Sequence, residues 1–576
     1  MAAYPGRFRW ASLYRPPDVN PINRKARSVP VLNPINMYGR VFFFSWIGFM
    51  VAFWAWYAFP PLLTVTIKAD LGLTATQVAN SNIVSLCATL LVRVVAGPLC
   101  DLFGPRKVFG ALLLLGAIPT GLAPLIHTAA GLYVVRFFMG ILGGSFVPCQ
   151  VWTTAFFDKN IVGSANAMTG GFGNAGGGIT YFIMPAVFNG LVDHQGYAAD
   201  TAWRLAFLVP LVVVLVTAVA MLVLCPDTPD GPWADRQKQA QQHLSEHHIH
   251  GLPEVERPEA QQTHPDSVAA AHGNAEDDNK HSRIHLGHSH EREASDRISR
   301  DNHPSQVFSS SSSTSSSSSS AVPAPNTRPV AARSAGHEVR LSSAEMLETA
   351  RGEIVQRPTA REACQVTFSL QTWALMLTYM CSFGAELAIN AVLSAYYLHN
   401  FPSLGQTGAS NWAAFFGFLN MVTRPLGGAA ADVLYGGRNL WWKKHWVTAC
   451  GVLSGVSLVV LGCLDPHERA TMFGLVALCA VFLEAGNGAN FALVPHVHPF
   501  ANGIVSGLTG AAGNVGGVLF SVIFRFVTVV NVDDELVVPA LMDYGRALWI
   551  IGVIHIAVNV AVCWIPPIPR GQVGGH

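Results

Sequence analysis

The stretch Thr169-Gly-Gly-Phe-Gly-Asn-Ala-Gly-Gly-Gly178 lies inside a long apolar segment and recurs far along the chain as Thr509-Gly-Ala-Ala-Gly-Asn-Val-Gly-Gly517. Thr, Gly, Gly, Asn, Gly and Gly stand at the same relative positions in both copies. A second repeat accompanies the first, because an arginine precedes an aspartate by eight residues in Arg93–Asp101 and again in Arg424–Asp432. This internal repeat predicts two structurally related halves, each bringing a glycine-rich helix and a buried arginine to one central site.

The composition is that of a membrane protein. Hydrophobic residues make up 51% of the 576 positions and charged residues only 12%, and the mean hydropathy is +0.34. Soluble domains carry roughly 25% charged residues, so this chain does not resemble one. The net charge of +1 argues against nucleic acid as a partner. The ten cysteines lack CxxC or zinc-site spacing, so we expect buried thiols, no metal and no other cofactor.

Twelve apolar segments are long enough to cross a bilayer as helices. They form two groups of six, which predicts an all-α membrane protein with twelve transmembrane helices in two pseudo-symmetric halves, at 41–225 and 367–566. The spans lie at about 41–63, 80–100, 108–127, 131–152, 163–190 and 204–225, and at about 371–398, 410–431, 445–464, 470–494, 502–530 and 545–566.

The polar regions predict the orientation in the membrane. Residues 1–40 carry seven Arg and Lys against Asp18 alone, which places this tail in the cytoplasm. An even number of spans returns the region 226–366 and the tail 567–576 to the same side. Region 226–366 is rich in His, Gln, Asp and Glu and holds a serine tract at 309–320, so we expect a disordered loop. Its serines make it a candidate substrate for kinases, and its histidines fit a solvated linker better than a metal site.

Two loop motifs resemble a known family. Gly97-Pro-Leu-Cys-Asp101-Leu-Phe-Gly104-Pro-Arg106-Lys107 joins the second and third spans and is similar to the GxxxDxxGxR loop of the major facilitator superfamily. A weaker copy, Gly428…Asp432…Gly436-Gly-Arg438, joins the eighth and ninth spans with one extra residue. In that family such residues form a cytoplasmic latch between helices, together with an arginine of span four. The resemblance implies gating roles for Asp101, Arg106, Arg136 and Asp432.

The doubled glycine motif narrows the resemblance to the nitrate/nitrite porter family within that superfamily. The long central loop and the span-seven sequence Cys381–Asn390 look like its fungal high-affinity branch. The resemblance covers nearly all of the chain outside the N-terminal tail and the central loop. It implies an alternating-access transporter of the plasma membrane, with both termini cytoplasmic, that imports nitrate and nitrite with protons. We expect a monomer whose partners are these ions and the lipid bilayer.

Arg93 and Arg424 are the centre of the predicted site. At 1.5 Å per residue, eight residues from Asp101 or Asp432 place each arginine about 12 Å deep, near the middle of a hydrocarbon core about 30 Å thick. An unpaired arginine there costs about 3 kcal/mol or more. Ion pairs with acidic residues of neighbouring helices, chiefly Glu386 or Glu484, are one explanation. We favour a cationic site whose two planar guanidinium groups hydrogen-bond the three oxygens of one nitrate.

The remaining site residues follow from the resemblance and from packing. The resemblance places Phe53, Phe146, Tyr379 and Phe383 around the anion. Asn174 and Asn514 need polar partners in their apolar spans, either across a helix interface or on the anion. Glu386 is a candidate proton carrier, and coupling through the arginine–anion site is equally open. Small residues let helices approach and slide, which suggests a conformational role for Gly170, Gly173, Gly177, Gly510, Gly513 and Gly517.

Nothing in the sequence predicts an enzyme. A phosphate-binding GxxxxGK[ST] loop is absent from the sequence, and the glycine runs lie within membrane helices, where no strand precedes them. Two other functions stay open. One is a facilitator for another small organic anion. The other is a nitrate sensor that binds the anion without moving it and signals through the central loop.

Overall fold

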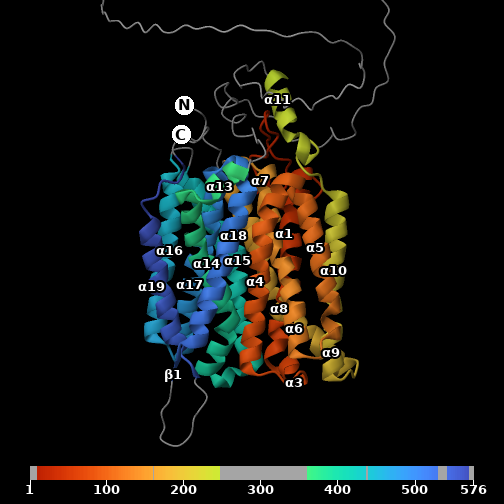
Figure 1. Ribbon diagram of the computed structural model, residues 1–576, viewed down its shortest axis with the longest axis vertical. Helices are drawn as coiled ribbons and strands as arrows, with labels where there is room; N and C mark the ends of the chain where they lie inside the picture. The colour runs from red at the N-terminus through yellow and green to blue at the C-terminus, as the bar shows by residue number, and fades with distance from the viewer. Residues whose placement is uncertain (1–9, 160, 247–359, 436–438, 530–540, 570–576) are drawn as a thin grey trace, which may run out of the picture. The chain divides into compact units, whose positions relative to one another are not determined.

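The computed structural model describes residues 10–159, 161–246, 360–435, 439–529 and 541–569 (Figure 1). Within these ranges, twelve helical segments run along a common direction, as Figure 1 shows. Eleven of them are long and apolar enough to cross a membrane. The twelfth, α15 (Gly405–Tyr435), is less apolar because it carries polar residues such as Asn420 and Arg424. The prediction of a twelve-helix, all-α membrane protein is confirmed.

The first six segments lie between residues 37 and 224. Short pieces extend several of them: η2 (Leu63–Ile67) and α3 (Lys68–Asp70) follow the first, η3 (Ala123–Leu125) ends the third, and η5 (Gly190–His194) ends the fifth. The main helices are α1 (Met37–Trp56) with α2 (Pro60–Leu62), α4 (Ala75–Phe103), α5 (Pro105–Leu122), α6 (Ala129–Met139) with η4 (Gly140–Ser145) and α7 (Phe146–Phe156), α8 (Val162–Asn189), and α9 (Ala199–Ala206) with α10 (Leu208–Leu224).

The second six segments lie between residues 370 and 562. They are α14 (Leu370–Asn400), α15, α16 (Trp441–Leu464), α17 (Arg469–Val497), α18 (Asn502–Phe526) and α19 (Tyr544–Val562), with η7 (Pro402–Leu404) and η8 (Pro499–Ala501) between them. The eleventh segment ends at Phe526, four residues before the predicted end, because β1 (Thr528–Val529) pairs antiparallel with β2 (Leu541–Met542). Among the named elements of the described ranges, only these two strands are not helical.

The predicted disordered region differs from expectation at both ends. Residues 233–246 form η6 (Trp233–Asp235) and α11 (Arg236–Glu246), and α13 (Ala360–Thr367) leads into the second half. The serine tract and most of the histidines lie outside the described residues. At the N-terminal side, the described chain starts with η1 (Trp10–Leu13).

The local sequence explains both ends of α4 and the tight turn into α5. At its start, Thr74 caps α4 in a reciprocal capping box with Gln77. Gly104 ends that helix with φ of 91°, a conformation that favours glycine, and Pro105 starts α5 at the position where its missing N–H costs nothing. The first loop motif is therefore a turn whose glycine and proline both have backbone roles.

The two glycine-rich helices pack across the interface between the halves. Helix α8 of the first half packs along α15 of the second, and α18 of the second packs along α4 of the first. The approach is close enough that a Cβ added to Gly171 would lie 2.4 Å from the Asn420 carbonyl oxygen. Each glycine-rich helix therefore packs against the arginine-bearing helix of the opposite half.

Candidate functional site

Arg93 of α4 and Arg424 of α15 meet at the interface between the halves. Both side chains are fully buried, with 0% exposure. The Cζ atom of Arg93 lies 5.0 Å from the ring centre of Phe146, and that of Arg424 lies 5.4 Å from the same ring. Among the residues that the structure describes, no carboxylate oxygen lies within 4.0 Å of either guanidinium. The two arginines thus share one aromatic neighbour, and neither has a carboxylate in salt-bridge range.

Three nitrogen atoms of these guanidiniums have no hydrogen-bond partner in the described part of the chain. Arg93 donates from Nε to the Gly143 carbonyl and from Nη1 to the Gly510 carbonyl, both at 2.9 Å. Arg424 donates from Nη2 to the Tyr379 hydroxyl at 3.1 Å. Nη2 of Arg93 and Nε and Nη1 of Arg424 are buried without a partner. Buried donors of this kind are costly unless a ligand satisfies them.

Aromatic rings pack against the two arginines. Phe146, Tyr379 and Phe383 are nearly parallel, with interplanar angles of 11° to 12° and centroid separations of 5.1 to 6.4 Å. Phe491 of α17 meets Phe146 edge-on at 4.7 Å, and the sequence offered no signal for it. Phe53 lies one ring further away, because it packs on Phe49, which packs on Phe146.

The two motif asparagines are buried but are not hydrogen-bonded to other helices within the described residues. Asn514 donates to the Gly510 carbonyl of its own helix at 3.1 Å, and that carbonyl also accepts from Arg93. Both polar atoms of the Asn174 amide lack a partner in the same ranges, as does Oδ1 of Asn514. Two amides with unused hydrogen-bonding groups therefore lie on the glycine-rich helices that flank the arginines.

The motif glycines leave room for the side chains of the site. A Cβ added to Gly170 would lie 2.9 Å from Nε of Arg424, and one added to Gly510 would lie 3.4 Å from Cδ of Arg93. The other four face rings or an aliphatic side chain: Gly173 faces Phe49, Gly177 faces Phe53, Gly513 faces Phe383 and Tyr379, and Gly517 faces Leu387. Each glycine-rich helix therefore accommodates the arginine of the opposite half.

Comparison with known families identifies the scaffold. The model of the Major Facilitator Superfamily matches residues 45–521. This chain belongs to the major facilitator superfamily. The chain is similar to Elsinochrome transporter 1 of Elsinoe fawcettii, at 31% identity over 97% of this chain and 98% of that protein. It is also 30% identical to High-affinity nitrate transporter 2.3 of Oryza sativa subsp. japonica, over 84% of this chain and 71% of that protein. The predicted resemblance to nitrate transporters is confirmed.

A solved structure supports the same fold. The proton:xylose symporter XylE, bound to 6-bromo-6-deoxy-D-glucose, aligns with a TM-score of 0.55 over 90% of this chain and 94% of its own, at 13% identity. At that identity the likeness concerns the fold alone. The superfamily match, the relatives named as transporters and the apolar helices together make this chain a multi-pass membrane transporter.

The two loop aspartates of this facilitator bridge its halves. Asp101 accepts hydrogen bonds from the backbone N–H groups of Gly503 and Ile504 at the start of α18, both at 3.2 Å. Asp432 accepts from the backbone N–H and the hydroxyl of Ser164 at the start of α8, at 2.6 and 2.8 Å. Each carboxylate thus lies at the positive N-terminal end of the opposite half's glycine-rich helix.

The two arginines predicted for the latch, Arg106 and Arg136, bind groups of their own half. Arg106 pairs with Asp227 at 2.6 Å and donates to the carbonyls of Leu222 and Cys225, all at the end of α10 in its own half. The placement of Arg136 beside the latch is wrong: it donates to the Ser81 hydroxyl at 2.8 Å, twenty residues before Asp101 on α4. That separation is about 30 Å along the helix. Gly436 to Arg438 of the second motif lie outside the described residues.

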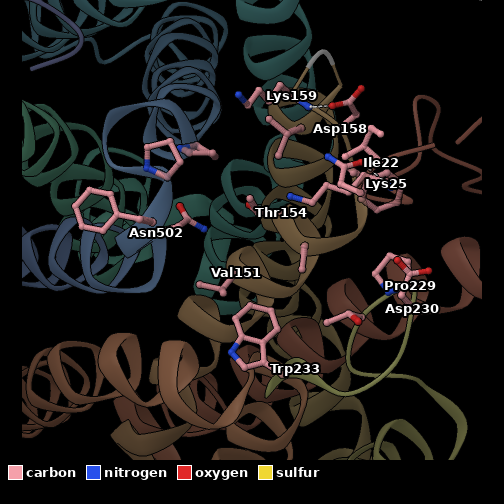
Figure 2. A pocket seen from close by; sticks show the side chains of 18 of the residues that line it. Ile22, Lys25, Val151, Thr154, Asp158, Lys159, Pro229, Asp230, Trp233 and Asn502 are labelled. Carbon is pink, nitrogen blue, oxygen red and sulfur yellow. Dashed lines mark hydrogen bonds between the residues drawn. The ribbon is translucent and has the colours of Figure 1, made fainter. Parts of the chain in front are cut away.

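Figure 2 shows a pocket that residues such as Lys25, Lys159 and Trp233 surround. Its walls come from the N-terminal segment, the α7–α8 connection, the segment after α10 and the start of α18. Asp101 lines it, together with Lys25, Lys159, Trp233 and Asn502. Asp101 is about 12 Å from Arg93 along α4. The pocket therefore lies next to Asp101 and apart from the central arginines.

Glu386 does not pair with the central arginines. Both of its carboxylate oxygens accept from asparagine amides: Oε1 from Asn420 at 2.8 Å and Oε2 from Asn487 at 2.6 Å. Glu484 of α17 shares the Asn420 amide with it. The two main acids of the spans are therefore held beside each other, and within the described residues neither makes a salt bridge with the central arginines.

Proposed function

We propose that this transporter imports nitrate, with nitrite as a second substrate, across the plasma membrane by proton symport, and that both termini face the cytoplasm. The observation that carries the proposal is the pair of buried guanidiniums with no carboxylate in range and with three unpartnered nitrogen atoms. Buried arginines without a carboxylate nearby favour the binding of an anion. The similarity to a protein named a high-affinity nitrate transporter supports nitrate as that anion.

The geometry suits a small planar oxyanion. Nitrate spreads one charge over three oxygens, so N–H groups of Arg93 and Arg424 can bind it at the same time. The bonds to the Gly143, Gly510 and Tyr379 oxygens hold both guanidiniums in place before the anion arrives. This preorganisation lowers the cost of binding. The parallel rings of Phe146, Tyr379 and Phe383 match the flat shape of the ion and exclude water from it.

Import requires a driving force. Moving one negative charge into a cell against a potential of 100 mV costs about 2.3 kcal/mol. Co-transported protons supply the compensating positive charge. Alternating access follows if the halves rock over the arginine site, with the Asp101 and Asp432 contacts closing one side of it. Breaking both contacts would open that side.

Uptake of labelled nitrate into vesicles that contain the purified protein tests the proposal. We expect accumulation when the outside is made acidic, and its loss when the proton gradient is collapsed. A sensor would bind nitrate without accumulating it. A nitrate-evoked current that is unchanged without a proton gradient would rule out symport.

The similarity to Elsinochrome transporter 1 favours elsinochrome as a second candidate substrate, because it extends over nearly the whole of both chains. Competition in the same vesicles separates the two candidates. If nitrate is the substrate, excess nitrite reduces labelled nitrate uptake and elsinochrome does not. If elsinochrome is the substrate, the vesicles transport elsinochrome and do not accumulate nitrate.

A further inference from the structure

Two buried carboxylates share one amide on the second half's side of the arginine site. Asn420 of α15 donates from Nδ2 to Glu386 of α14 at 2.8 Å and to Glu484 of α17 at 3.2 Å. The exposed fractions of Glu386, Asn420 and Glu484 are 2%, 1% and 0%. Three different helices thus bring two acids to a single nitrogen atom in a site closed to bulk solvent.

Neutral groups make the remaining contacts of the pair. Asn487 donates to Oε2 of Glu386 at 2.6 Å, and the Thr423 hydroxyl lies in hydrogen-bond contact with Oε2 of Glu484. No ion pair of either glutamate occurs within the described ranges. Two ionised carboxylates this close together in a dry interior repel each other strongly, so at least one of them favours the neutral form.

The contacts of Thr423 leave room for a proton on Glu484. The Thr423 hydroxyl lies 2.8 Å from the Leu419 carbonyl, the usual acceptor one turn back in a helix, and it also contacts Oε2 of Glu484. A hydroxyl has one hydrogen, so it cannot donate to both oxygens. If Thr423 donates to Leu419, the contact with Glu484 is a hydrogen bond only when the carboxyl group donates.

The pair is connected to the anion site through one helix. Asn420 and Thr423 hold the carboxylates, and the next residue on α15 is Arg424. On α14, Glu386 follows Tyr379 by seven residues, which is two helical turns. Among the described residues, the titratable groups close enough to interact electrostatically with the pair are Arg424, Tyr379, Tyr57 and Cys479.

We propose that the Glu386–Glu484 pair is the binding site of the co-transported proton, an inference that rests on the proposed nitrate symport. The proton leaves water, adds to a carboxylate of the pair and later returns to water on the other side, with no other bond made or broken. While the pair is ionised, its charge attracts Arg424 and competes with the anion. Protonation removes that competition, so nitrate binds the protonated protein more tightly. By linkage, a proton binds the nitrate-bound protein more tightly by the same factor.

The variants Glu484→Gln and Glu386→Gln test the proposal, since glutamine mimics the protonated form. Glu468→Gln is the matched control, because it removes an exposed carboxylate next to the start of the same helix α17. We expect each site variant to lose about tenfold or more of its proton-driven nitrate accumulation and to keep nitrate exchange at equal concentrations. The control should keep both activities.

The outcomes separate this inference from the function on which it rests. If wild-type vesicles do not accumulate nitrate under a proton gradient, the proposed function fails and the proton site fails with it. If wild type accumulates nitrate and both glutamine variants do so equally well, the proton site alone is overturned.

A measurement without variants guards against loss of folding. Nitrate added to purified wild-type protein in weakly buffered detergent solution should make the protein take up protons, which a pH indicator records as a rise in pH. Chloride is the control anion. The measurement is repeated at pH values from about 5 to 8. If nitrate binds at each of them without proton uptake, the proposal is overturned.

Discussion

At the residue scale, the two arginines should not tolerate lysine. Arg93→Lys keeps the charge but loses the planar guanidinium. That group bonds the Gly143 and Gly510 carbonyls with two nitrogen atoms and leaves a third for the anion. One hydrogen bond to a charged group is worth about 1.5–3 kcal/mol, so nitrate affinity should fall roughly tenfold to 150-fold. Arg424→Lys should behave alike, because Arg424 also binds Tyr379. The KM for nitrate uptake measures the effect.

Arg469→Lys is the control at this scale, since Arg469 is exposed and bonds Ser403 at the surface. Its KM should equal that of wild type. Near-normal uptake by the double variant Arg93→Lys with Arg424→Lys would contradict the arginine site.

At the element scale, the glycine-rich helices should respond unequally to alanine. A Cβ at Gly170 would lie 2.9 Å from Nε of Arg424, too close for either group to stay in place, whereas one at Gly510 meets its neighbours at 3.4 Å or more. We therefore expect Gly170→Ala to reduce nitrate affinity strongly and Gly510→Ala to reduce it much less. Nitrate binding to the purified variants measures the difference.

Gly474→Ala on α17 is the matched control, because nothing lies within 4 Å of the added carbon. Alanine is favoured over glycine by up to about 1 kcal/mol inside a helix, so this variant should be at least as stable as wild type. Equal affinities for Gly170→Ala and Gly510→Ala would mean that the motif does not accommodate the arginines.

At the scale of the whole molecule, the Asp432 contact should contribute to stability as well as to closure. Asp432 joins Ser164 of the other half and also pairs with Lys443, whose side chain is fully buried, at 2.9 Å. Asp432→Asn leaves that ammonium without its counter-ion, which costs about 3–5 kcal/mol in buried pairs. We expect a clear drop in the thermal unfolding temperature of the purified protein.

The double variant Asp432→Asn with Lys443→Gln supplies the control for this effect. Removing both charges avoids the unpaired ammonium, so part of the lost stability should return. Transport should stay impaired in the double variant, because the charged contact with Ser164 across the halves is still missing. A double variant less stable than Asp432→Asn would show that the ion pair is not the source of the effect.

The sequence by itself determined the class of the molecule and the number of spans, and it predicted the depth of the arginines. Apolar length and helical rise are properties of one segment at a time, so twelve spans and two matched arginines could be read from spacing. The repeat also predicted that both glycine runs serve the central site. The family resemblance pointed to Phe146, Tyr379 and Phe383, which the structure brings together around the guanidiniums.

Only the tertiary structure decided which helix faces meet. Spacing along a helix does not say that α8 packs on α15 or α18 on α4, that Arg136 contacts Ser81 far from the latch, or that Phe491 completes the aromatic wall. The same holds for Glu386 and Glu484, which lie 98 positions apart (484 − 386) and become partners through Asn420. The physical reason is that the energies of charge interactions and hydrogen bonds fall steeply with distance. Distances between helices are set by how the helices pack together, and the sequence of one segment does not specify that packing.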